Sequence, residues 1–244
     1  MVFEQEFTLS GEHIDPWGKC KPSVLLYIAQ EAAGEHCAQL GYDWEAMAKK
    51  NLFWAVIRTR VQVTRLPQLG ETVTVKTWPM PTTRTAYPRT VEILDRQGKR
   101  LAQILSLWVL MDKTSRTMVL PGKSGIQVPG QLTGSELPTP GSIVPQQQEN
   151  ISCRTVGLTE LDQNGHMNNT RYLDWVSDLL PRDFCREHSV KEFTVCYLNE
   201  VLEGQQVALH FGFDETGVFQ VDGSHRCTDD DGKKTRVFSV KMIF

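Results

Sequence analysis

An internal repeat is the feature that most constrains how this chain of 244 residues can fold. Residues 15–19, Asp-x-x-Gly-Lys, recur as residues 162–166, Asp-x-x-Gly-His, at an offset of 147. Further matches occur at an offset of 134, pairing residues 64–71 with 198–205 and Gly98-Lys99 with Gly232-Lys233. Repetition on this scale indicates two tandem copies of one structural unit.

Each copy has the pattern strand, loop, helix and then several strands. The first helix should begin at Pro22-Ser23, because proline suits the first turn, and end before Gly41. The second should run from Asn169 to about Leu180 and stop at Pro181, with Asn168 or Asn169 as its N-cap. Alternating apolar residues predict antiparallel strands over 2–9, 54–63, 72–78, 86–94, 101–111, 151–155, 193–198, 206–213, 218–226 and 236–244, the last two joined by a turn at 230–234.

The first helix is apolar on most sides, so a curved antiparallel sheet must cover it. We therefore predict an α+β protein of two tandem hot-dog domains, each a long central helix wrapped by a curved antiparallel β-sheet. The first domain should span residues 1–125 and the second 149–244. Residues 126–148 should form a semi-extended linker, because prolines recur there among Gly, Ser and Gln.

Composition narrows the class of protein. With 40% hydrophobic and 23% charged residues the chain is an ordinary globular sequence, and no apolar run approaches the roughly 20 residues of a membrane span. No signal-peptide pattern opens the sequence, so we expect a cytoplasmic location. The six cysteines are scattered without zinc-binding spacing, which favours reduced thiols and no metal site.

Charge is unevenly distributed along the chain. The formal net charge is −3, yet residues 49–116 contain 13 Lys and Arg against four Asp and Glu. A local excess of this size permits docking of an acidic partner. Nucleic acid is not expected, because no nucleic-acid-binding motif accompanies these charges.

The loop before the second helix concentrates polar groups. Asp162, Asn164, His166 and Asn168 follow one another at two-residue steps. At a helix N-terminus free backbone N–H groups favour negative charge, so those of Asn168 and Asn169 could hold an oxyanion. A plain turn and cap would use the same residue types, so the loop alone leaves both interpretations open.

The aligned positions separate the two halves chemically. His166, Asn164 and Glu200 of the second half correspond to Lys19, Trp17 and Leu66 of the first. We therefore predict that the second half is catalytic and that the first half provides the substrate pocket. Leu25, Ile28 and Trp54 are candidate pocket residues, although plain core packing is the alternative for each.

Asp-x-Asn-x-His-x-Asn-Asn followed by Tyr-Leu-x-Trp, in the second of two repeats, resembles the acyl-acyl carrier protein thioesterases of plants and bacteria. The resemblance extends over nearly the whole chain and includes Trp17-Gly18, residues 30–33 (Gln-Glu-Ala-Ala), Phe53-Trp54 and residues 197–200 (Tyr-Leu-Asn-Glu). It implies hydrolysis of fatty acyl-acyl carrier protein to free fatty acid, which terminates fatty acid synthesis. The family's catalytic positions match Asp162, Asn164, His166 and Glu200 of this chain.

One departure from the plant members bears on the mechanism. Those members resemble one another in having a cysteine after the glutamate, whereas this chain has Val201. Valine offers no lone pair, which argues against an obligatory thiol nucleophile. Activated water suffices, because a thioester carbonyl is electrophilic and thiolate leaves readily.

An imidazole such as that of His166 is suited to removing the proton from water, with Asp162 or Glu200 orienting it. Either carboxylate could be the base instead if it were desolvated, and Asn164 would position water or the carbonyl. No metal or organic cofactor is required. An acyl-CoA thioesterase, a hydratase and a non-catalytic acyl-binding module remain alternatives, acyl chain length is not specified, and a homodimer is compatible with the sequence.

Overall fold

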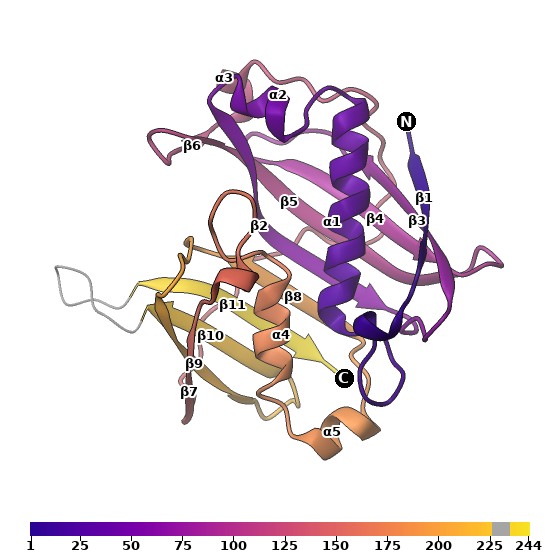
Figure 1. Cartoon of the computed structure of the whole chain (residues 1–244), viewed down its shortest axis with the longest axis vertical. Coiled ribbons are helices and arrows are strands. Elements are labelled where there is room, and N and C mark those ends of the chain that lie inside the picture. The colour runs from indigo at the N-terminus through magenta and orange to yellow at the C-terminus, as the bar shows by residue number, and fades with distance from the viewer. Residues whose placement is uncertain (226–234) are drawn as a thin grey trace. The chain divides into compact units, whose positions relative to one another are not determined.

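The computed structural model describes residues 1–225 and 235–244 (Figure 1). The chain divides into two compact units, Met1–Pro140 (unit 1) and Gly141–Phe244 (unit 2). This division lies within the segment 126–148 that we expect to be the linker. The turn predicted at 230–234, and with it the Gly98-Lys99 and Gly232-Lys233 correspondence, lies outside the described residues.

Each unit lays a helix on an antiparallel sheet. The strand order is β1-β3-β4-β5-β2 in unit 1, with β6 paired to β5, and β7-β9-β10-β11-β8 in unit 2. The strands of unit 1 are β1 (Phe3–Thr8), β2 (Leu52–Val63), β3 (Thr72–Pro79), β4 (Tyr87–Leu94), β5 (Arg100–Asp112) and β6 (Met118–Val119). Those of unit 2 are β7 (Asn150–Thr155), β8 (Glu192–Tyr197), β9 (Gln206–Phe213), β10 (Phe219–His225) and β11 (Arg236–Ile243). The helices are α1 (Pro22–Gln39), α2 (Trp44–Ala48) and α3 (Pro121–Ser124) in unit 1 and α4 (Arg171–Ser177) and α5 (Arg182–Glu187) in unit 2, with short 3-10 turns at Gly11–His13 and Leu158–Glu160.

The sequence repeat is also a repeat of strand register. Phe3 pairs with Thr77 in unit 1, and Asn150 pairs with Phe211 in unit 2, at the same offsets of 147 and 134. The register also shifts at matching places, between Ile93 and Leu94 and between Gly223 and Ser224. The predicted α+β class, with tandem units of helix on antiparallel sheet, is therefore confirmed.

The helices of the two units differ in length. α1 begins at Pro22 as predicted, and Gly41 after its end has a φ of 77°. α4 covers Arg171–Ser177 alone, so the long central helix predicted for both halves is present in unit 1 and not in unit 2. Beyond Ser177 the chain continues as a tighter turn, in which the N–H groups of Leu179 and Leu180 donate to the carbonyls three residues earlier, so the predicted end at Leu180 included this turn.

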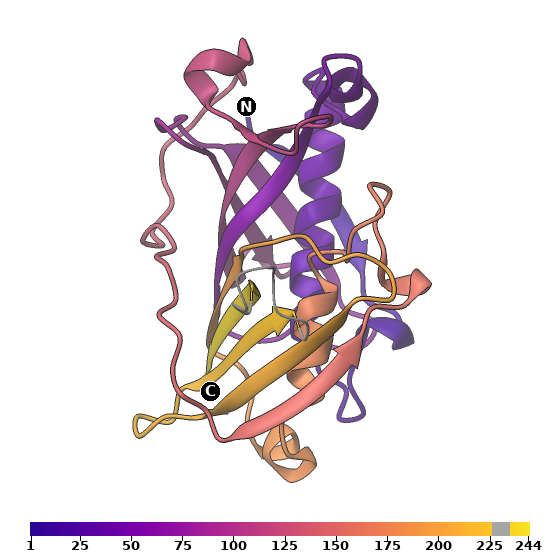
Figure 2. The ribbon, with the colours of Figure 1, turned by 90° about the vertical axis from the view of Figure 1, so that its left-hand side faces the viewer.

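The segment between the units is anchored to the outer faces of the sheets. Figure 2 shows residues 126–140 on the side of the unit 1 sheet opposite α1. There Glu136 forms an ion pair with Arg100 at 2.5 Å, and Leu137 is buried. The composition of this segment did not indicate this packing.

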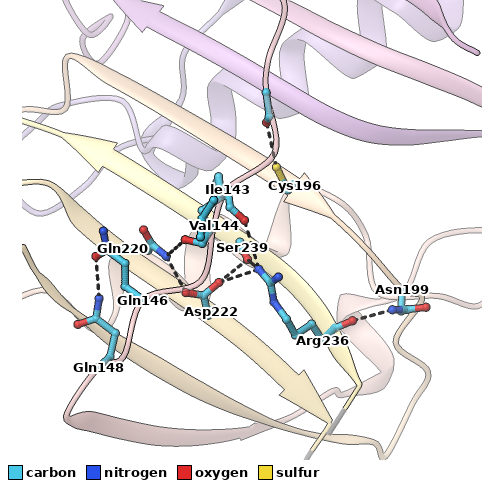
Figure 3. A network of polar contacts seen from close by, with 11 residues as sticks. Ile143, Val144, Gln146, Gln148, Cys196, Asn199, Gln220, Asp222, Arg236 and Ser239 are labelled. Atoms are coloured by element: carbon cyan, nitrogen blue, oxygen red, sulfur yellow. Dashed lines mark hydrogen bonds and ion pairs between the residues drawn. The ribbon is translucent and has the colours of Figure 1, made fainter. Parts of the chain in front are cut away.

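In unit 2 the corresponding face carries a buried polar network (Figure 3). Asp222 Oδ1 accepts a hydrogen bond from Arg236 Nη2 at 3.1 Å, and its Oδ2 accepts one from Gln220 Nε2 at 2.7 Å. Gln220 and Arg236 also donate to the carbonyls of Val144 and Ile143. These bonds hold residues 143–144 against the outer face of the sheet. Among the described residues, no helix has the length and hydropathy needed to cross a membrane.

Candidate functional site

A tight turn organises the polar loop of unit 2. Asp162 Oδ1 accepts hydrogen bonds from the backbone N–H groups of Asn164 at 2.8 Å and His166 at 3.2 Å. The Asp162 N–H donates in turn to the His166 carbonyl at 2.7 Å. Gly165 has a φ of 79°, a conformation that favours glycine.

The same turn occurs elsewhere in the molecule. Asp15 accepts from the N–H groups of Trp17 and Lys19 at 2.9 and 2.8 Å. The hairpin turns beginning at Asp95 and Asp214 repeat this pattern, each with a glycine of positive φ three residues later. Because the pattern recurs in ordinary hairpins, the contacts of the Asp162 carboxylate with its own loop are a requirement of the turn.

A second contact brings Glu200 to the loop. The Met167 N–H donates to the Val201 carbonyl at 2.8 Å, and His166 forms an isolated β-bridge with Leu202. This pairing places Glu200 Oε2 at 3.1 Å from His166 Nε2. The His166 side chain is 9% exposed and that of Glu200 41% exposed, so the pair lies at the boundary between core and solvent.

Tyr172 packs close to the same carboxylates. Burial raises its pKa above the ordinary value, and the negative charges of Asp162 and Glu200 raise it further. The ring packs edge-on against Phe238 of β11, with centroids 4.8 Å apart. Tyr172 therefore keeps its proton and presents a neutral hydroxyl near two acids. From the sequence, Tyr172 was identified only as part of the Tyr-Leu-x-Trp segment that follows the polar loop.

The two asparagines predicted to supply oxyanion donors differ in their contacts. The Asn168 N–H donates to the Glu160 carbonyl at 2.8 Å, and Asn168 Oδ1 accepts from the Thr170 N–H at 3.0 Å. The Asn168 N–H therefore already has a hydrogen-bond acceptor, and the Asn168 side chain forms a turn just ahead of α4. The Asn169 N–H has no acceptor among the described residues, so it stays the candidate donor.

Glu160 supports the loop and was not identified from the sequence. Its Oε1 accepts from Trp175 Nε1 at 2.6 Å, and its Oε2 accepts from the Gly157 N–H at 2.8 Å. These bonds join the start of the loop to α4. The only sequence signal was an acid ahead of the polar loop, which is common in turns.

The predicted pocket residues belong to unit 1, whereas Asp162, Asn164, His166 and Glu200 belong to unit 2. Leu25 and Ile28 of α1 are fully buried. Trp54 is half-buried, donates to the Tyr42 carbonyl at 3.1 Å and packs edge-on against Tyr87 with centroids 5.0 Å apart.

Comparison with known proteins gives consistent matches over both units. The model of the acyl-ACP thioesterase N-terminal domain matches residues 1–120, and that of the C-terminal domain matches residues 144–239. The chloroplastic palmitoyl-acyl carrier protein thioesterase of Gossypium hirsutum is 27% identical over 220 residues, which cover 82% of this chain and 52% of the relative. The chloroplastic dodecanoyl-[acyl-carrier-protein] hydrolase of Umbellularia californica is 27% identical over 215 residues, covering 82% and 56%. The chain thus spans about half the length of the curated relatives it matches.

Solved structures share the fold. An acyl-ACP thioesterase from Bacteroides thetaiotaomicron superimposes with a TM-score of 0.89 at 21% identity, covering 100% of this chain and 97% of the other. The 12:0-ACP thioesterase from Umbellularia californica gives a TM-score of 0.83 at 22% identity, covering 99% and 96%. At these identities the likeness establishes the fold, and it confirms the hot-dog class predicted from the sequence.

Proposed function

Because the chain belongs to the acyl-acyl carrier protein thioesterase family, we propose that it hydrolyses fatty acyl-acyl carrier protein and releases free fatty acid. This reaction would end the growth of an acyl chain in fatty acid synthesis. The observation that carries the proposal is the contact of 3.1 Å between His166 Nε2 and Glu200 Oε2. The copy of this loop in unit 1 has Lys19 and Leu66 at these two positions and so lacks the pair.

The proposed mechanism uses one water molecule. His166 takes a proton from water while the hydroxide oxygen attacks the thioester carbonyl, and Glu200 stabilises the resulting imidazolium. The tetrahedral oxyanion then collapses, the carbon–sulfur bond breaks, and the imidazolium returns its proton to the leaving thiolate. The net change is one water consumed, one acid and one thiol formed.

The remaining predicted residues have supporting roles in this proposal. Asp162 holds the loop through the N–H groups of Asn164 and His166, which sets the position of the imidazole. The Asn164 amide would orient the water or the carbonyl. The Asn169 N–H would donate to the oxyanion. Direct activation of water by Glu200 is the competing mechanism.

We propose that carrier protein docks on a basic cluster in unit 1. Lys49 and Lys50 follow α2, Lys113 and Arg116 lie in the turn after β5, and all four are exposed. The Lys113 N–H donates to the Asn51 carbonyl at 2.8 Å, which joins the two segments. Lys and Arg at a rim accelerate association with an acidic surface. Other basic residues of the segment 49–116 form ion pairs with Glu4, Glu71, Glu92 and Glu136.

Leu25, Ile28 and Trp54 are proposed to contact the acyl chain within unit 1. A homodimer is not required, since the proposed reacting residues belong to one unit of one chain. The cytoplasm stays the proposed location, although the curated relatives are described as chloroplastic.

The test supplies purified protein with acyl carrier protein carrying saturated chains of increasing length, and the same chains on coenzyme A. We expect release of free acid, faster from the carrier protein. Release from coenzyme A alone would indicate an acyl-CoA thioesterase, and addition of water to an enoyl chain a hydratase. Bound fatty acid without any turnover would indicate an acyl-binding module.

A further inference from the structure

A row of polar side chains crosses the sheet of unit 1 beneath α1. Arg89 of β4 pairs with Ser106 of β5, which pairs with Thr59 of β2. The three residues are buried, and Arg89 contacts His36 and Cys37 of α1, which places the row on the helix-covered face. Buried polar groups in such a layer are unusual and require an explanation.

Unit 2 shows that the fold does not require this row. Phe219 of β10 pairs with Met242 of β11, which pairs with Phe193 of β8, in the register of Arg89, Ser106 and Thr59. Arg89 and Phe219 are equivalent positions, because each lies the same number of residues before the register shift of its strand, at Ile93 in β4 and at Gly223 in β10. These three residues of unit 2 are buried and apolar. The same scaffold therefore fills the row with an ordinary core.

The Arg89 guanidinium has no carboxylate partner among the described residues. Its contacts are neutral groups, namely His36 Nδ1 at 3.1 Å, Thr77 Oγ1 at 3.1 Å and Cys37 Sγ at 3.5 Å. Burial lowers the pKa of Arg89 from its ordinary value. A buried cation without a counter-charge is costly, so its presence in unit 1 is not explained by stability.

His36 carries a buried donor that has no acceptor among the described residues. A guanidinium can only donate, so His36 Nδ1 must accept from Arg89 and the ring proton must lie on Nε2. Burial, together with the charge of Arg89, lowers the pKa of His36 to about 4, which keeps the ring neutral near pH 7. Within the described part of the chain, the buried Nε2 has no hydrogen-bond partner. The cluster thus has more donors than acceptors.

We propose that Arg89, His36, Thr59 and Ser106, the unit 1 polar cluster, bind an oxygen function on the acyl chain of the substrate, remote from the thioester. A hydroxyl, an oxo group and a carboxylate all supply the missing acceptor. The protein then prefers oxygen-bearing acyl thioesters to hydrocarbon chains of equal length. This inference rests on the proposed function for its substrate class.

Position and size support the assignment. Tyr87 lies two residues before Arg89 on the same face of β4 and packs against Trp54, a proposed chain-contacting residue. Thr59 and Ser106 are smaller than the Phe193 and Met242 of unit 2, so these positions hold less side-chain volume. Ser106 Oγ accepts from Trp108 Nε1 at 2.9 Å, which fixes its orientation.

The first experiment compares hydrolysis of carrier protein loaded with a saturated chain and with the same chain bearing a terminal hydroxyl, oxo group or carboxylate. We expect kcat/KM of the wild type to favour at least one oxygen-bearing chain by about 10- to 100-fold, the range for a hydrogen bond to a charged group. Arg89→Met should abolish the preference and His36→Leu should reduce it. Gln103→Leu is the matched control. Gln103 pairs with Glu92 of β4 in the same sheet, and its side-chain amide is buried with no hydrogen-bond partner among the described residues.

A second measurement separates binding from structure. Arg89→Met should melt no lower than the wild type, because it removes an unpaired buried charge, and a free dicarboxylic acid should raise the melting temperature of the wild type alone. Equal hydrolysis of all chains with an unchanged ratio in Arg89→Met would overturn the inference while leaving the proposed function intact. Absence of all hydrolysis would refute the proposed function. The melting experiment would then test the cluster by itself, and no shift by the diacid would overturn it.

Discussion

Residues 15–19 and 162–166 have the same backbone conformation but carry chemically different side chains. In each, an aspartate accepts the N–H groups of residues two and four positions later, and the residue after the turn donates to the carbonyl of a distant segment, Cys20 to Pro67 and Met167 to Val201. The difference lies in the side chains that this frame brings together, Lys19 and Leu66 in unit 1 against His166 and Glu200 in unit 2. The turn and its backbone hydrogen bonds are therefore common to both units, whereas the proposed site depends on the side chains that unit 2 carries at these positions.

The largest effect should come from His166→Ala. Loss of the proposed base should lower kcat by about 100- to 10,000-fold, the usual contribution of general base catalysis. Lys19→Ala, the matching change in unit 1, should leave kcat within about twofold of the wild type, since no proton transfer is assigned there. Steady-state hydrolysis of acyl-acyl carrier protein measures both. Equal losses in the two variants would break the distinction between the units.

Glu200→Gln should have the next largest effect. The amide keeps the shape of the side chain but cannot stabilise an imidazolium, so kcat should fall by about 10- to 100-fold. Glu203→Gln is the control, because Glu203 is an exposed acid of the same segment. If Glu200→Gln abolished turnover while His166→Ala kept it, Glu200 itself would be the base.

Asp162→Asn tests whether the carboxylate acts through the turn. An asparagine oxygen can accept hydrogen bonds from the same N–H groups, so the activity of Asp162→Asn should fall by less than about tenfold. Asp162→Ala and Asp15→Ala should each lower the free energy of unfolding by about 1 kcal/mol, as loss of a capping side chain does. Denaturant unfolding and turnover are measured on the same samples. A loss in Asp162→Asn as large as in His166→Ala would assign Asp162 a direct chemical role.

Charge reversal at the basic cluster should have a smaller effect, confined to binding. Lys49→Glu with Lys50→Glu should raise KM for acyl-acyl carrier protein by about three- to tenfold at low salt and leave kcat unchanged, because exposed charges steer encounter and are screened by salt. Arg96→Glu with Lys99→Glu, at the exposed turn between β4 and β5, is the control. Equal effects of the two pairs would indicate a general charge effect and no local docking surface.

The smallest effect concerns pH and again separates the units. The pKa of His36 is lowered to about 4 in the folded chain, so the unfolded chain binds the extra proton below about pH 6.5. Stability should therefore fall as pH drops from about 6.5 toward 4, and less so in His36→Leu. Melting temperatures of the two proteins at pH 7 and pH 5 measure the difference. Identical pH dependence would show that His36 is not held neutral.

Local pattern was enough for most of the secondary structure. The strands of both units and the start of α1 follow the predicted ranges closely, because alternation and a proline in the first turn act over a few residues. The same local reasoning overestimated the length of α4 and did not identify α2 or α5. Short helices are decided by what they pack against more than by their own sequence.

The sequence by itself determined the tandem repeat, the aspartate turns and the residue types in the loop at 162–166, since each depends on neighbours within a few positions. Tertiary structure alone decided that Glu200 meets His166 across thirty-four residues of chain and that the Glu160 carbonyl accepts the Asn168 N–H. It also decided that Thr59 of β2 lies beside Ser106 of β5, which in turn lies beside Arg89 of β4. Contacts of this kind are set by strand register, and register depends on the packing of the whole sheet.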